Sequence, residues 1–124
     1  MTRINILIVE DEMVIALNLK MQLENLLYNV LDIMDSGEKT IKKLEDVKPD
    51  LILMDHTLKG ELDGIQTTEI ISQKYKIPIL YITAQNDQST LDKIKNSSAI
   101  GVLTKPLYIH ELDKTIQTIL NKCN

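Results

Sequence analysis

The sequence predicts an α/β protein built on one five-stranded parallel sheet with helices on both faces. Short apolar runs of four to six residues alternate along the chain with segments of helical periodicity. Runs this short, with little polar alternation, are typical of strands that are covered on both faces. A helix follows each strand, and this alternation gives parallel strands joined by right-handed crossovers.

The expected strands are found in the apolar runs. They are residues 4–9, 30–34, 51–54, 77–82 and 99–103. The run from Val30 to Met34 alternates more than the others, which favours a position at the edge of the sheet. Pro78 stands at the entrance of its run, where a missing N–H does least harm to a strand.

The first two helices carry clear signals of periodicity and capping. An apolar face of the first helix consists of Ile15, Leu19, Leu23 and Leu26. Ser36 is a suitable N-cap for the second helix. Pro49 is expected to end that helix, because the residue before a proline avoids the α region. The apolar positions of the second helix are Ile41, Leu44 and Val47.

The remaining helices are marked by a capping box and by apolar spacing. Residues 63–66, Asp-Gly-Ile-Gln, resemble a capping box that opens a helix running through Tyr75. Leu91 and Ile94 mark a short fourth helix. The last helix carries apolar residues at 109, 112, 116 and 119 and ends near Leu120. No output domain is expected after it, and residues 1–124 are interpreted as one domain, either stand-alone or part of a longer protein.

Composition agrees with one folded domain and narrows the function. The 124 residues match the common size of a single domain. Apolar residues make up 44% and charged residues 26%, which argues against disorder. The 18 acidic and 14 basic residues give a net charge of −4, which argues against direct nucleic-acid binding. With no Trp or Phe, the core must be aliphatic.

The sequence lacks the features of disulfide-bonded, secreted or membrane-spanning proteins. Cys123 is the single cysteine, so neither an intramolecular disulfide nor a CxxC metal motif is expected. The first five residues lack the charged and apolar regions of a signal peptide, and no apolar run approaches the roughly 20 residues of a membrane helix. We therefore expect a cytoplasmic protein without membrane contact.

Polar residues gather where the expected strands end, at the edge where such sheets bind ligands. The groups are Glu10-Asp11-Glu12, Asp55-His56-Thr57, Thr83-Ala84 and Thr104-Lys105-Pro106. Two carboxylates about 4 Å apart repel each other by about 4 kcal/mol at an effective dielectric constant of 20. A hard divalent cation such as Mg²⁺ removes that cost, and it commonly shares its coordination shell with a phosphate.

This combination of groups suits phosphoryl transfer. An aspartate carboxylate can act as a nucleophile and become an aspartyl phosphate, and Asp55 is the candidate. Mg²⁺ and Lys105 would supply positive charge against the phosphoryl oxygens. Thr83 could donate its hydroxyl to one of them. The spacing therefore predicts phosphorylation of Asp55 with Mg²⁺ as the cofactor.

Five motifs occur in a fixed order along nearly the whole chain. They are Ile8-Val9-Glu10-Asp11-Glu12, Leu53-Met54-Asp55, Asp63-Gly64, Thr83-Ala84 and Lys105-Pro106. Each is weak alone, but in this order and spacing they closely resemble the receiver domain of two-component response regulators. The resemblance implies a flavodoxin-like (βα)5 fold with strand order 2-1-3-4-5.

The resemblance also implies a role for each matched position at the metal site. Asp55 would be the phosphoacceptor and a metal ligand. Asp11 would bind Mg²⁺ directly, and Glu10 would bind it through water. Thr57 would lend its backbone carbonyl to the metal, which leaves its side chain free to vary.

Two further positions would respond to the phosphoryl group. Thr83 would be the switch hydroxyl that moves toward it, and Lys105 would pair with it. The resemblance implies a cis peptide bond between Lys105 and Pro106, which costs little before proline.

The resemblance implies partners as well. The donor would be a phosphohistidine on a histidine kinase or phosphotransfer protein, and an unidentified downstream protein would respond. A homodimer could form through the face of the fourth helix, fifth strand and last helix. The domain would catalyse only its own phosphorylation and dephosphorylation, so it is not expected to be an enzyme in the usual sense.

The chain departs from the family pattern at several positions. Residues 58–64 form a loop one residue longer than the common one, and Lys59 replaces a usual proline. Val102 stands where many members carry a rotating Tyr or Phe, and Leu107 stands where Phe is frequent. Because a β-branched side chain is stiff, we expect the signal to travel through the backbone of residues 83–90 instead.

Two other functions fit parts of the pattern. An aspartyl-phosphate phosphatase of the haloacid dehalogenase type is disfavoured, because the second Asp of its motif and room for a cap domain are both missing. A receiver-like scaffold that is never phosphorylated is also disfavoured, because such forms usually lose an acid, the acceptor or the lysine, and this chain keeps all of them. Among nearby residues, His56 is expected to point away from Asp55, Asp63 to cap a helix, and His110 to lie on the surface.

Overall fold

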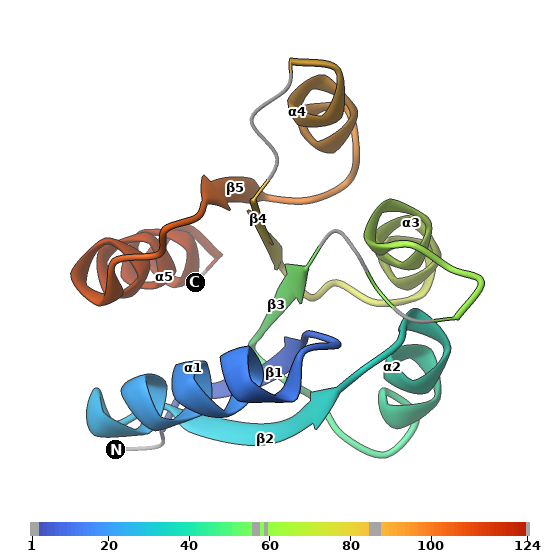
Figure 1. Ribbon diagram of the computed structural model, residues 1–124. Coiled ribbons are helices and arrows are strands. Elements are labelled where there is room, and N and C mark those ends of the chain that lie inside the picture. Colours follow the sequence, from blue (N-terminus) through green and yellow to red (C-terminus); the bar gives the residue numbers. More distant parts are fainter. Residues whose placement is uncertain (1–2, 56–57, 59, 85–87, 124) are drawn as a thin grey trace.

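The computed structural model describes residues 3–55, 58, 60–84 and 88–123, and within these ranges five parallel strands form one sheet. The strands are β1 (Asn5–Val9), β2 (Asn29–Met34), β3 (Leu51–Asp55), β4 (Ile79–Thr83) and β5 (Gly101–Thr104). Their order is β2-β1-β3-β4-β5, with β2 and β5 at the edges (Figure 1). The expected fold class, strand order and edge position of β2 are confirmed.

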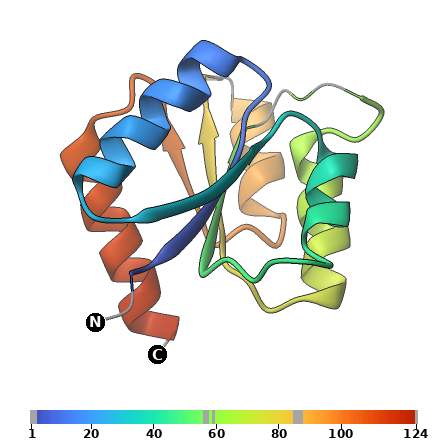
Figure 2. The same cartoon turned by 90° about the horizontal axis from the view of Figure 1, so that it is seen from below.

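Helices cover both faces of the sheet. They are α1 (Met13–Asn25), α2 (Gly37–Lys43), α3 (Gly64–Lys74), α4 (Gln88–Lys95) and α5 (Ile109–Cys123). Figures 1 and 2 show α1 and α5 on one face and α2, α3 and α4 on the other. None of the helices described is long and apolar enough to cross a membrane.

Strand alternation divides the core into two clusters, which are mostly aliphatic but also bury Tyr28 and Tyr81. In β1, Ile6 and Ile8 face α1 and α5, whereas Leu7 and Val9 pack with the helices on the opposite face. β3 and β4 divide in the same way. Because successive side chains of a strand point to opposite faces, each strand serves both clusters. The expected covering of both faces is therefore confirmed.

Both predicted helix caps are present. The Ser36 side chain accepts a hydrogen bond from the backbone N–H of Lys39 at 3.2 Å. Asp63 and Gln66 form a reciprocal capping box: the Asp63 carboxylate accepts from Gln66 N at 2.8 Å, and the Gln66 side chain accepts from Asp63 N at 2.9 Å. These caps satisfy N–H groups that the first turn of a helix cannot pair internally.

Several predicted boundaries were wrong. The second helix ends at Lys43, so Val47 and Pro49 lie beyond it. The chain tightens there, because Glu45 N donates to the carbonyl of Lys42 three residues back, at 3.2 Å. The fifth strand begins at Gly101 rather than at residue 99.

The buried face of α1 also differs from the predicted one. It consists of Ala16, Leu19 and Leu23, while Ile15 is 38% exposed. The small Ala16 therefore takes the inward position, and Ile15 is left beside the carboxyl edge of the sheet.

The loop before α3 is held by a contact that its sequence does not reveal. The Glu38 carboxylate of α2 accepts hydrogen bonds from Glu61 N at 3.2 Å and Leu62 N at 3.3 Å. Gly60 has a φ of +91°, and an added Cβ there would lie 2.3 Å from a Glu38 oxygen. The positive φ favours glycine here, because other residues rarely adopt it.

Candidate phosphorylation site

The carboxylates of Glu10, Asp11 and Asp55 meet at the carboxyl edge of the sheet. One oxygen from each lies within 4.8 Å of the others. The neighbouring strands β1 and β3 bring them together, because their register pairs Val9 with Met54. The predicted convergence of these three acids is confirmed.

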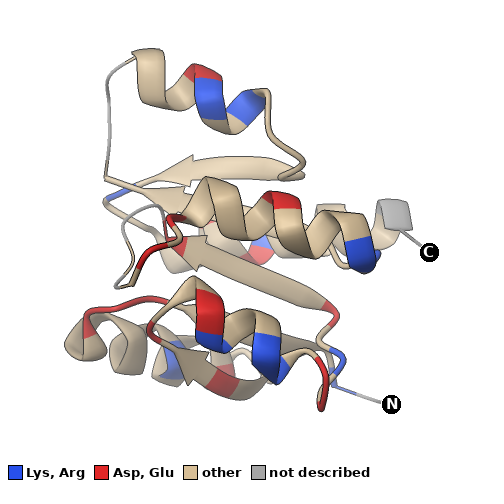
Figure 3. Cartoon of the chain, turned by 90° about the vertical axis from the view of Figure 1, so that its right-hand side faces the viewer, with Lys and Arg blue, Asp and Glu red and all other residues tan. Residues whose placement is uncertain are grey.

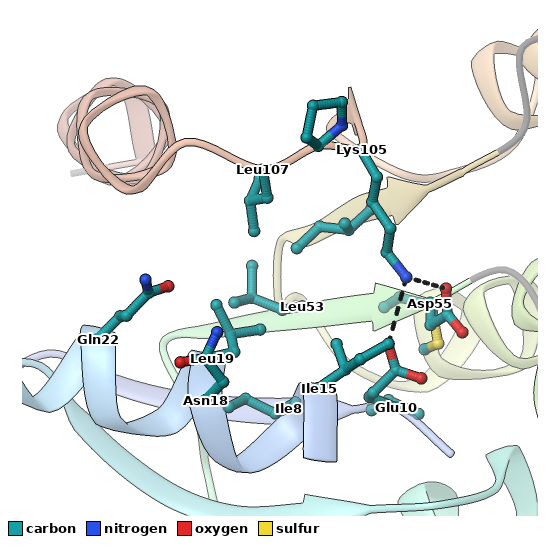
Figure 4. A pocket seen from close by; sticks show the side chains of 14 residues that line it. Ile8, Glu10, Ile15, Asn18, Leu19, Gln22, Leu53, Asp55, Lys105 and Leu107 are labelled. Carbon is teal, nitrogen blue, oxygen red and sulfur yellow. Dashed lines mark hydrogen bonds and ion pairs between the residues drawn. The ribbon is translucent and has the colours of Figure 1, made fainter. Parts of the chain in front are cut away.

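Strand alternation explains why Lys105 reaches the same cluster. Glu10 continues the face of Ile6 and Ile8, and Lys105 continues the face of Leu103 on β5. The ammonium of Lys105 lies 3.5 Å from Glu10 Oε1 and 3.7 Å from Asp55 Oδ1, as the dashed lines in Figure 4 show. One cation thus faces carboxylates from two different strands.

Burial and neighbouring negative charge raise the pKa of Glu10 in the acidic cluster. Glu10 is only 5% exposed, and burial is the largest cause that raises its pKa, to about 7. The negative charge of Asp55 raises this pKa further, whereas a hydrogen bond from Glu12 N at 3.1 Å and the Lys105 charge lower it. Oxygen ligands held together against repulsion fit a hard divalent cation such as Mg²⁺.

We expect Mg²⁺ binding to depend on pH around neutrality, because metal must compete with a proton on Glu10. With a pKa of about 7, Glu10 is mostly protonated at pH 6 and ionised at pH 8. Isothermal titration should give an Mg²⁺ affinity about tenfold lower at pH 6 than at pH 8. Glu10→Gln should flatten this dependence, and an equally steep profile in that variant would contradict the assignment.

The structure describes the positions of Thr83 and of the bond between Lys105 and Pro106. Thr83 is buried at the end of β4, and its carbonyl accepts a hydrogen bond from Lys105 N at 2.8 Å. Thr83 does not line the cleft around Asp55. The expected cis bond between Lys105 and Pro106 is present. The switch role of Thr83 stays a prediction.

Some neighbours behave as expected, and others lie outside the described residues. Asp63 is a helix cap, and His110 is exposed. Glu12 is exposed at the N-cap of α1 and is not part of the carboxylate cluster. The expectations for His56, Thr57, Lys59, residues 85–87 and the side chain of Cys123 fall outside what the structure describes.

A cleft of about 280 Å³ surrounds this site, and sequence reasoning did not foresee it. Besides Glu10, Asp55 and Lys105, its wall includes Ile15 and Asn18 of α1. Gln22 and Leu107 also line it. The only available signal was the spacing of Ile15, Asn18 and Gln22, which places them along one side of a helix.

The strand order and the ligand edge place the chain in the flavodoxin-like class of α/β proteins. Its sequence matches the model of the response regulator receiver domain over residues 6–117. The chain therefore belongs to the response regulator receiver domain family. Phosphorylation-based signal reception is the function of this family, which is not a family of enzymes in the usual sense.

Curated relatives are transcriptional regulators of about twice the length. The chain is 37% identical to the alkaline phosphatase synthesis transcriptional regulatory protein PhoP of Bacillus subtilis, over 94% of this chain and 48% of that protein. It is 28% identical to the transcriptional regulatory protein PdtaR of Mycobacterium tuberculosis, over 94% of this chain and 57% of that protein. The chain thus spans about half the length of these curated relatives.

Solved receiver domains share the fold closely. A signal receiver domain of a modulated diguanylate cyclase from Desulfovibrio desulfuricans G20 aligns with a TM-score of 0.90 and 35% identity, over 98% of this chain and 96% of that one. The receiver domain of a sensor histidine kinase from Pseudomonas aeruginosa PAO1 aligns with a TM-score of 0.86 and 28% identity, over 97% and 99%. That structure has a magnesium ion coordinated in its active site cleft. The family binds Mg²⁺ at this acidic site and interacts with histidine kinases and downstream effectors.

Proposed function

We propose that Asp55 accepts a phosphoryl group from a phosphohistidine on a histidine kinase or phosphotransfer protein. The observation that carries this proposal is the position of Asp55, whose carboxylate lies in one cluster with those of Glu10 and Asp11 and 3.7 Å from the Lys105 ammonium. An aspartate so placed is half-buried in an open cleft and surrounded by groups that suit a phosphoryl dianion and a divalent cation.

The transfer itself requires little from the protein beyond position and charge. An oxygen of Asp55 attacks phosphorus, the phosphorus–nitrogen bond of the donor breaks, and the imidazole keeps the electron pair. The Lys105 ammonium then pairs with a phosphoryl oxygen. Thr83 would donate its hydroxyl to another, which requires a movement toward Asp55.

Asp11 and Asp55 would hold Mg²⁺ directly together with the backbone carbonyl of Thr57, and Glu10 would bind it through water. When bound, the ion supplies positive charge against the phosphoryl oxygens. Burial and mutual repulsion of Glu10 and Asp55 support this assignment, because the carboxylates offer hard oxygen ligands that Lys105 neutralises only in part.

Mg²⁺ affinity should depend on Asp11 far more than on Glu12. Asp11 belongs to the carboxylate cluster, whereas Glu12 is exposed at the start of α1. We expect Asp11→Ala to weaken Mg²⁺ binding by at least about tenfold and Glu12→Ala by less than about twofold, since exposed charges are screened. Calorimetric titration of both variants measures this. Equal losses would contradict the ligand assignment.

The proposal extends to the context of the domain. Residues 1–124 would act as one receiver domain in the cytoplasm and would catalyse their own phosphorylation and dephosphorylation. Phosphorylation would alter binding of a downstream protein or of a second copy through the face of α4, β5 and α5. Direct nucleic-acid binding is not part of this proposal: the net charge is −4, and both signs are mixed over α2, α3 and α4 (Figure 3).

Beryllofluoride with Mg²⁺ provides the test, because it mimics a phosphoryl group on an aspartate. In amide NMR spectra, wild type should shift around Asp55 and Lys105, and Asp55→Asn should not. If the amide chemical shifts of wild type do not change on addition of beryllofluoride, a scaffold that is never phosphorylated would be favoured. Steady turnover of a small phosphomonoester would instead favour a phosphatase.

A further inference from the structure

The cleft at Asp55 extends beyond the acidic cluster, between α1 and the segment that follows β5. Glu10, Asp55 and Lys105 form one end, and Figure 4 shows Leu19, Leu53 and Leu107 between these charges and Gln22. Its volume of about 280 Å³ is close to the lower limit of about 300 Å³ for small-molecule pockets. The cleft is therefore large enough for a group beyond the phosphoryl group itself.

The floor and the two borders of this extension are aliphatic. Ile8 and Leu53 form its floor from the sheet, and both are at most 1% exposed. Ile15 and Leu107 border it from α1 and from the segment after β5. Alternation along the strands places the floor and the acids on the same face, so the charged and aliphatic parts form one continuous surface.

Two sequence features keep the extension open. Ala16 takes the buried position of α1 and leaves Ile15 at the border of the cleft, 38% exposed. Leu107, on the side of the segment after β5, lines it with a medium-sized aliphatic side chain rather than an aromatic ring. Asn18 and Gln22 add neutral amides rather than charges to the lining, and Figure 4 shows Gln22 at the end away from the acids.

We propose that this extension receives the aliphatic chain of a small acyl phosphate, so that acyl phosphates of about four carbons phosphorylate Asp55 faster than acetyl phosphate does. The inference rests on the proposed function of Asp55. The first methylene of an acyl phosphate is three bonds from phosphorus, and Ile15 and Leu107 line the same cleft as Asp55, so they offer the acyl chain an apolar surface.

The reaction is balanced without any further reactant. An Asp55 oxygen forms a bond to phosphorus, and the bond between phosphorus and the acyl oxygen breaks. The electron pair leaves with the acyl group, which departs as a carboxylate and needs no proton from the cleft. The aliphatic wall contributes by removing methylene groups from water, which favours the longer chain.

The experiment compares three donors with the whole chain and Mg²⁺: acetyl phosphate, butyryl phosphate and phosphoramidate, which has no carbon chain. Second-order rate constants for labelling are measured by intact mass spectrometry. Burial of one methylene contributes about a fourfold increase in a rate or binding constant when it is complete. Two methylenes in a half-open cleft should therefore make the labelling rate constant of butyryl phosphate about fivefold higher than that of acetyl phosphate. Phosphoramidate serves as the reference in each variant.

Substitutions in the cleft test whether the acyl chain of the donor binds there. Leu107→Phe should fill the extension and bring the ratio of butyryl to acetyl rates near one, and Ile15→Asn should lower this ratio by making the border polar. Val14→Ala is the matched control, because Val14 lies on α1 outside the cleft and is 82% exposed. It should keep the wild-type ratio.

The outcomes separate this inference from the proposed function. If all three donors label Asp55 and butyryl and acetyl phosphate react equally fast, the acyl site is wrong and the phosphoacceptor assignment stands. A preference that survives in both Leu107→Phe and Ile15→Asn also overturns the acyl site. If no donor labels Asp55, both proposals are wrong.

Discussion

Replacement of Asp55 by asparagine should abolish labelling of the chain by acetyl phosphate in the presence of Mg²⁺. The amide has nearly the shape of the carboxylate but lacks a nucleophilic oxygen, and it leaves Lys105 facing Glu10 alone. Wild type should gain about 80 Da per chain in intact mass, the increment of one phosphoryl group. The variant should lose at least about a thousandfold in rate, because no other described acid combines the same neighbours.

A matched control distinguishes loss of the acceptor from loss of a charge. Asp46 is exposed and lies just beyond α2, away from the carboxylate cluster. Asp46→Asn removes the same charge and should be labelled at the wild-type rate. The same mass gain in Asp55→Asn as in wild type would show that another residue accepts the phosphoryl group.

The site could be predicted from sequence because strand ends are local features. Glu10 and Asp55 directly follow apolar runs, Asp11 comes next after Glu10, and parallel strands bring their carboxyl ends to one edge. Lys105 follows the last strand by the same logic. The positions of Asp55, Asp11 and Lys105 therefore required only the strand assignments and the parallel topology.

Features that depend on distances between elements could not be predicted in this way. The raised pKa of Glu10 reflects its burial, which the sequence does not state. The contact of Glu38 with the loop before α3 joins residues more than twenty positions apart. The cleft depends on the volumes of Ile15 and Leu107 and on the rotation of α1, which Ala16 sets by taking the inward position.

The misplaced end of α2 has a similar cause. Apolar periodicity continued to Val47 and favoured a longer helix, but the hydrogen bonds tighten after Lys43. Leu44 is buried at that point, so the chain can turn toward β3 while keeping its core contact. Tertiary packing thus overrides a periodic pattern at the helix end, where sequence signals are weakest.

Asp11→Asn should stabilise the metal-free protein, although it removes a proposed ligand. The folded state holds a carboxylate oxygen of Asp11 within 4.8 Å of oxygens of Glu10 and Asp55, whereas in the unfolded chain Asp55 separates from the other two. Removing one charge relieves this repulsion, and we expect a gain of about 1–2 kcal/mol, or about 3–8 °C in melting temperature. The gain should be larger at pH 8 than at pH 5, because Glu10, with its pKa raised to about 7, is ionised only at the higher pH.

Thermal unfolding with a chelator and with excess Mg²⁺ separates repulsion from metal binding. Wild type should be stabilised by Mg²⁺ through mass action, and Asp11→Asn should lose most of that increment while melting higher than wild type in the chelator. Glu12→Gln is the control, since the exposed Glu12 lies outside the cluster and its loss should change neither condition by more than about 1 °C. A lower melting temperature of Asp11→Asn in chelator would mean that Lys105 already balances the acids. The ion pairs of Lys105 with Glu10 at 3.5 Å and with Asp55 at 3.7 Å would then hold the acids in place, and there would be no net repulsion for the substitution to relieve.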